Sequence, residues 1–147
     1  MTTRQRSPWQ ALPTNLRTSL STVWRMGVPA EATALYGRWW QLETWLRQLI
    51  YMELRARDGM GWAAALPASA EYREAKDRRH TYMATPDAQA RLAYLDLSPL
   101  LDLLEEHWPL FADSLIDQAV WSGRTIELRN IRNRIGHCRR PHPDVNG

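Results

Sequence analysis

The chain has 147 residues, the length of a single domain, and 44% of them are hydrophobic, which excludes most multidomain arrangements and a disordered chain. Its one cysteine, Cys138, excludes an intramolecular disulfide, and no apolar run approaches the roughly 18 residues of a membrane span. Residues 1–9 are polar and contain a proline, unlike a signal peptide, so we expect a cytoplasmic protein without a membrane partner.

The formal net charge of +3 is small, but it is unevenly distributed along the chain. Residues 92–123 contain six acidic side chains and no Lys or Arg, whereas residues 124–140 contain six Arg against Glu127 alone. The C-terminal segment therefore carries +5, and the rest of the chain sums to −2. This distribution, rather than the sum, indicates where an anionic partner would bind.

The apolar residues recur with helical periodicity almost throughout the chain. A first helix is predicted over Thr14–Met26, ended by Gly27, and a second, long helix over about residues 30–57, opened by Pro29 and stopped by Asp58-Gly59. The long helix places apolar side chains at i, i+3 and i+4 spacing: Leu35, Trp39, Leu42, Leu46, Leu49, Ile50 and Leu54.

The middle of the chain is less regular. Residues 63–65 and 71–80 are predicted to form short helical pieces in a charged, exposed excursion. Thr85-Pro86 and Ser98-Pro99 each place a capping residue before a proline, and each predicts the start of a helix. The helix that begins at Ser98-Pro99 is leucine-rich and should stop near Trp108-Pro109.

Two further helices are predicted, over about residues 112–121 and 124–138. The predicted fold class is all-α, a helical bundle of about five to seven helices. The expected organisation is an N-terminal helix and arm over residues 1–28, the bundle over residues 29–140, and a tail over residues 141–147.

The last predicted helix carries the residues best suited to chemistry. Asn133 and His137 are four residues apart and share a face, while Arg132 lies about 140° from His137 around the helix. Arg offers a planar fork of donors that matches phosphate oxygens, His exchanges a proton near neutral pH, and Asn adds an uncharged hydrogen bond. These three side chains together suit chemistry on a phosphodiester. No carboxylate cluster or His/Cys set with metal-ligand spacing accompanies it, so neither a metal nor another cofactor is indicated.

The same helix has a plainer interpretation. An apolar stripe is predicted to dock it on the bundle, formed by Leu128, Ile131 and Ile135. Arg and His in a last helical turn are favoured by the helix dipole. From the residues alone, a solvated basic helix end therefore remains the alternative to a catalytic site.

The segment Arg132-Asn133-Arg134-Ile135-Gly136-His137 resembles the R-N-x-x-x-H motif of the HEPN superfamily (higher eukaryotes and prokaryotes nucleotide-binding domains). It follows Leu128-Arg129-Asn130-Ile131, which is similar to the lead-in of many members. Upstream, Trp108-Pro109-Leu110-Phe111 is similar to a frequent W-x-x-F, and Glu43-Thr44-Trp45-Leu46-Arg47 resembles the E-x-x-x-R/K signature of the first core helix. The resemblance covers about residues 30–137 and is closest to the domains of RNA-surveillance and phage-defence ribonucleases.

This resemblance implies a metal-independent endoribonuclease that dimerises, so that two copies of the motif form one composite cleft. Arg132 would bind and neutralise the phosphate, His137 would assist proton transfer as the ribose 2′-hydroxyl attacks, and Asn133 would position the site. Glu43 and Arg47 would support Arg132. The products would be a 2′,3′-cyclic phosphate and a 5′-hydroxyl, and DNA would be spared. Further contacts to RNA are expected from Arg129, Arg134, Arg139 and Arg140.

The implied setting is bacterial antiphage defence or a toxin-like system, with an antitoxin or a fused regulatory domain as a further partner. Two departures from the family are present. The tyrosine that one toxin branch carries two places after the histidine is replaced by Arg139, so that mode of regulation is not supported. Many members continue with another helix, whereas this chain stops at Gly147: either that helix is absent or the chain is the N-terminal part of a longer protein.

Two other functions remain open from the sequence. The first is a catalytically silent HEPN-like module that binds RNA or nucleotide, or only dimerises. The second is a DNA-binding helical domain with the last helix in the major groove. The −2 charge of the remaining chain argues against this function, because DNA is an anion.

Several single features also have two interpretations. A helix-surface ion pair explains Glu43 and Arg47 as well as a supporting role beside Arg132 does. Packing explains three tryptophans better than base stacking does: Trp39 in the core, and Trp40 and Trp45 at a helix or dimer interface. The segment 78–80 is interpreted as a solvated loop or helix end, with contact to the RNA backbone as the alternative. The acidic residues of 96–117 could face the Arg-rich helix.

Overall fold

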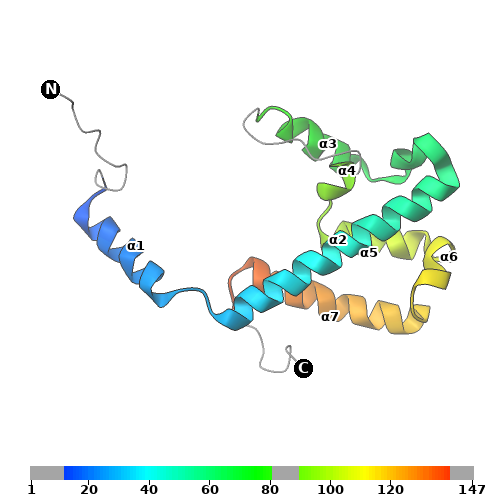
Figure 1. The fold of residues 1–147 in the computed structure, drawn as a ribbon. Coiled ribbons are helices and arrows are strands. Elements are labelled where there is room, and N and C mark those ends of the chain that lie inside the picture. Colours follow the sequence, from blue (N-terminus) through cyan, green and yellow to red (C-terminus); the bar gives the residue numbers. More distant parts are fainter. Residues whose placement is uncertain (1–11, 81–89, 140–147) are drawn as a thin grey trace.

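The computed structural model describes residues 12–80 and 90–139, and these residues form an all-helical bundle, as predicted (Figure 1). The prediction of a helix start at Thr85-Pro86 lies outside the described residues. The elements in chain order are α1 Thr14–Met26, α2 Ala30–Asp58, the 3₁₀ helix η2 Gly59–Ala65, α3 Ala68–Asp77, α4 Ala90–Ala93, α5 Leu97–Glu106, α6 Trp108–Phe111, the 3₁₀ helix η3 Ala112–Ser114, and α7 Gln118–Gly136.

The first two helices end where the glycines predict. Gly27 follows α1 with φ 66° and Gly59 follows α2 with φ 59°, left-handed values that a residue without a Cβ adopts at little cost. Helix α2 continues one residue beyond the predicted end, to Asp58. Both helix ends are therefore determined by local backbone preferences.

The hydrophobic core lies between α2 and α5, and α7 returns along both helices (Figure 1). The most deeply buried large side chains are Leu46, Ile50, Leu54, Leu92, Leu95, Leu97, Leu100, Leu101, Leu104 and Phe111. Helix α7 contributes Trp121 and Thr125, four residues apart on one face. The Thr125 hydroxyl satisfies its buried position by donating to the Ser122 carbonyl and to a Glu105 carboxylate oxygen.

Helix α3 is held against residues 91–96 mostly by polar contacts. Its Glu74 carboxylate is buried and accepts from Arg78 at 2.5 Å and Arg91 at 2.9 Å. Burial raises the pKa of Glu74, but the hydrogen bonds and charges of the two arginines outweigh it and hold this pKa below its ordinary value of 4.5. The Tyr94 hydroxyl donates to Asp77, which raises the pKa of Tyr94.

The predicted helix over residues 112–121 is wrong. Residues 112–114 form η3, and Leu115 is extended. One continuous helix, α7, covers both the last residues of this predicted helix and most of the separate helix predicted over 124–138. Asp117 is the reason: its carboxylate accepts from the amides of Ala119 and Val120 and caps a helix start there. Gly123 does not break the helix.

The leucine-rich helix also begins earlier than Ser98-Pro99 predicts. Helix α5 begins at Leu97, and Asp96 occupies the N-cap position in the extended conformation, with φ −69° and ψ 172°. Helix α5 ends at Glu106, as the Trp108-Pro109 pair predicts, but that pair itself opens the short helix α6.

Helix α1 stands apart from the other helices in Figure 1, joined to α2 through residues 27–29. None of its side chains is buried, although its apolar residues form one stripe. Its exposed large side chains are Leu16, Leu20, Val23, Trp24 and Met26. The core of the bundle is therefore built without α1.

Candidate functional site

The candidate site lies at the C-terminal end of α7. The helix stops at Gly136, His137 is the C-cap residue, and Cys138 adopts a left-handed conformation with φ 52°. The Cys138 amide donates to the Ile135 carbonyl at 3.0 Å and the Arg139 amide to the Arg134 carbonyl at 2.9 Å. This pair of bonds is a Schellman motif, which ordinarily has glycine at the position of Cys138. The motif fixes the backbone from which the His137 imidazole projects.

Arg132 bends back toward the same helix end. A Cβ built on Gly136 would lie 3.6 Å from Nη1 of Arg132, so the guanidinium lies over the glycine that precedes His137. Asn133 and His137 are one helical turn apart, and the His137 amide donates to the Asn133 carbonyl at 3.2 Å. The side chains of Asn133 and His137 are exposed. Arg132 and Gly136, one turn apart, thus share a face, and His137 follows at the same helix end.

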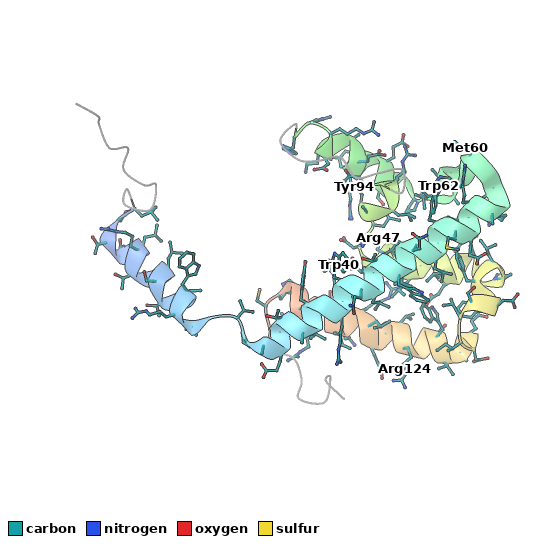
Figure 2. All side chains as sticks on the ribbon, viewed as in Figure 1. Trp40, Arg47, Met60, Trp62, Tyr94 and Arg124 are labelled. Carbon is teal, nitrogen blue, oxygen red and sulfur yellow. The ribbon has the colours of Figure 1, made fainter. Side chains whose placement is uncertain are left out.

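Glu43 and Arg47 form more than a helix-surface ion pair. Arg47 donates to a Glu43 carboxylate oxygen at 2.5 Å, and Glu43 also accepts from Nε1 of Trp39 at 2.9 Å. Arg47 further donates to the main-chain carbonyls of Leu92 and Leu95, each at 3.2 Å. Figure 2 shows Arg47 on α2, near the segment that contains Tyr94. The pair therefore ties α2 to the connection between α4 and α5.

Asp96, next to Leu95, brings Arg132 into the same region. An Asp96 carboxylate oxygen lies 3.7 Å from Nη2 of Arg132, an ion pair too long for a good hydrogen bond. The other oxygen accepts from Nη1 of Arg73 at 3.1 Å. Arg47 and Arg132, which sequence reasoning places together, thus contact adjacent residues at the start of α5.

The acidic α5 and the basic α7 partly neutralise each other. Arg129 donates to Asp102 at 2.6 Å, in addition to the Arg132–Asp96 pair. Contact of Arg129 with RNA would therefore compete with its bond to Asp102 or use the other donors of its guanidinium. Arg134 and Arg139 are exposed near the helix end, and Arg140 lies outside the described residues.

The remaining sequence candidates divide by exposure. Trp39 is half-buried against the core, whereas Trp40 and Trp45 are 60% and 46% exposed, so the bundle covers them only in part. Arg78 caps the end of α3, as expected for a helix end. Leu128, Ile131 and Ile135 are half-buried, and the deepest contacts of α7 come from Trp121 and Thr125.

Arg73 and Asp96 are the residues of this region that sequence reasoning missed. They are 23 residues apart, and no spacing or motif links them. Within the described ranges, no three His, Cys, Asp or Glu side chains gather to hold a metal ion. Nor is any helix of those ranges both long and apolar enough to cross a bilayer.

Comparisons with known proteins leave the family open. No family model matches the chain, and neither curated proteins nor solved structures provide a match. The HEPN resemblance therefore depends on the motif and its context in this sequence.

Proposed function

We propose that the protein is a metal-independent endoribonuclease of the HEPN type that acts as a homodimer in antiphage defence or a toxin-like system. The observation that carries the proposal is that Arg132 and His137 lie together at the end of α7. The Arg132 guanidinium lies over Gly136, directly before the exposed His137 on a backbone held by the Schellman motif. A phosphate-binding cation and a titratable group at one fixed helix end suit cleavage of a phosphodiester.

In the proposed reaction, the 2′-oxygen attacks the adjacent phosphorus and the bond to the 5′-oxygen breaks. His137 takes the proton from the 2′-hydroxyl or delivers one to the leaving 5′-oxygen, and its counterpart in a second copy performs the other transfer. Arg132 neutralises the charge that develops on the phosphate, and Asn133 orients the site. The products are a 2′,3′-cyclic phosphate and a 5′-hydroxyl.

The test is RNA cleavage in excess chelator by wild type, Arg132→Ala and His137→Ala. Loss of a general acid–base group typically lowers the rate by about 10²–10⁴-fold, and we expect a decrease of that order for His137→Ala. Arg124→Ala and His80→Ala are matched controls, because both side chains are exposed and lie away from the end of α7. A single 2′-deoxy nucleotide at the cleavage position should abolish the reaction there.

Three results would each overturn the proposal: no cleavage by wild type, equal cleavage by all variants, or cleavage that depends on a divalent metal. RNA binding by wild type without cleavage, retained in His137→Ala, would support the silent module instead. Sedimentation should show a dimer, since the composite site needs two copies. Binding to duplex DNA at least as tight as to RNA would support the DNA-binding alternative.

A further inference from the structure

The start of α5 shows an unusual use of an N-cap aspartate. Asp96 has the extended backbone of an N-cap residue, but its carboxylate makes no capping hydrogen bond. Instead it lies between Arg73 and Arg132, at 3.1 Å and 3.7 Å. The carboxylate is therefore turned away from its own helix and toward two cations from α3 and α7.

One of these cations is held in place by a contact other than Asp96, and the other lies at the end of α7. Nη1 of Arg73 also donates to the Tyr94 carbonyl at 2.9 Å, and the Arg132 guanidinium lies against Gly136. Arg47 fixes the intervening main chain through the Leu95 carbonyl. If the carboxylate left, the Tyr94 carbonyl would still hold Arg73 beside this position, with Arg132 next to it on α7.

We propose that Arg73 and Arg132 form a phosphate-binding site and that the Asp96 carboxylate occupies it when no ligand is bound. The identity of the phosphate as part of RNA rests on the proposed function, whereas the site itself does not. A carboxylate and a phosphate both accept from guanidinium groups, and the phosphate brings more oxygens and charge. Asp96 is 54% exposed, and Arg73 and Arg132 are 44% and 39% exposed, so a ligand can reach all three side chains.

Displacement of Asp96 should cost little. Its 3.7 Å contact with Arg132 is long, and pairs this exposed contribute little to stability. The displaced carboxylate has an alternative acceptor role, because its backbone is already in the N-cap conformation. It can accept from the Ser98 amide, whereas Pro99, one residue further, has no amide proton. The arginines would gain a phosphate while α5 gains a cap.

The experiment measures binding of a short 2′-O-methyl oligoribonucleotide, which cannot be cleaved by 2′-oxygen attack, to the full chain by fluorescence anisotropy. Asp96→Asn removes the competing charge and should tighten binding by roughly two- to fivefold, the equivalent of one exposed ion pair. Asn is also a good N-cap residue, so this variant should fold. Asp113→Asn, exposed in η3, is the control for the same change in net charge.

Arg73→Ala should weaken binding and should also remove the benefit of Asp96→Asn in the double variant. Equal tightening of binding by Asp96→Asn and Asp113→Asn would overturn the phosphate site. The same conclusion would follow if Asp96→Asn tightened binding as much in the Arg73→Ala background, or if the oligoribonucleotide did not bind measurably. The two proposals fail separately. Binding that follows this pattern without cleavage of natural RNA retains the site and rejects the ribonuclease; cleavage that needs Arg132 and His137 without this pattern does the reverse.

Discussion

Replacement of Arg47 by alanine tests whether the connection between α4 and α5 depends on α2. The Arg47 side chain is only 21% exposed, and it donates to Glu43 at 2.5 Å and to the carbonyls of Leu92 and Leu95 at 3.2 Å. Its loss leaves the 16% exposed Glu43 carboxylate with Trp39 as its remaining donor.

The expected cost of Arg47→Ala is about 3 kcal/mol, taking the lower value of about 1.5 kcal/mol for each of the two carbonyl bonds to a charged donor. A helix-surface ion pair alone would be worth only about 0.3–0.5 kcal/mol, so the two interpretations differ several-fold. For a domain of this size the loss corresponds to a decrease in Tm of about 6–12 °C.

The measurement is urea unfolding followed by circular dichroism. Arg38→Ala is the matched control, since Arg38 is exposed on the same helix, and it should change the free energy of unfolding by no more than about 0.5 kcal/mol. Arg47→Lys should recover part of the loss, because an ammonium can pair with Glu43 but lacks the planar fork of donors. A loss for Arg47→Ala as small as that for Arg38→Ala would refute the reasoning.

Three further predictions concern stability. Leu101→Ala in the core should lower the free energy of unfolding by about 2–5 kcal/mol. The same change at Leu20 of α1, which is 39% exposed, should lower it by less than about 0.5 kcal/mol. Equal losses would show that α1 packs on the bundle. Because the pKa of Glu74 is below 4.5 in the folded chain, its contribution is present above that pH and is lost as the pH falls through the lowered pKa. The stability difference between wild type and Glu74→Gln should therefore shrink in acid urea titrations, and a constant difference would contradict the role of its ionised form. Cys138→Gly should raise stability by up to about 1 kcal/mol in thermal melts, since glycine adopts φ 52° without strain; a decrease would show that the cysteine side chain contributes at the helix end.

Local chemistry accounts for the parts of the fold that were predicted correctly. Gly27 and Gly59 end α1 and α2 because each takes a positive φ that needs no tertiary partner. The apolar stripe of α2 was predicted from periodicity alone, and Leu46, Ile50 and Leu54 are fully buried.

The error in the last helices has a tertiary cause. Gly123 lies between the two helices predicted over residues 112–121 and 124–138, and a glycine costs a helix about 1 kcal/mol. In the structure, one continuous helix places Trp121 and Thr125 on the same buried face. Asp117 caps the start of this helix, so α7 begins at Gln118, within the range of the helix predicted over residues 112–121. Packing of that face against α5 outweighs the local preference of the glycine.

The sequence by itself determined the all-α class, the apolar stripe of α2 and the R-N-x-x-x-H segment whose function remains a prediction. Only the tertiary structure decided that Arg132 faces Asp96 and that Arg73 joins it from α3. The physical reason is distance along the chain: Arg73 and Asp96 are 23 residues apart, and only the placement of α3 and α7 beside Asp96 brings these charges together. The +5 of the C-terminal segment is thereby partly balanced within the bundle, through Asp96 and Asp102, before any partner binds.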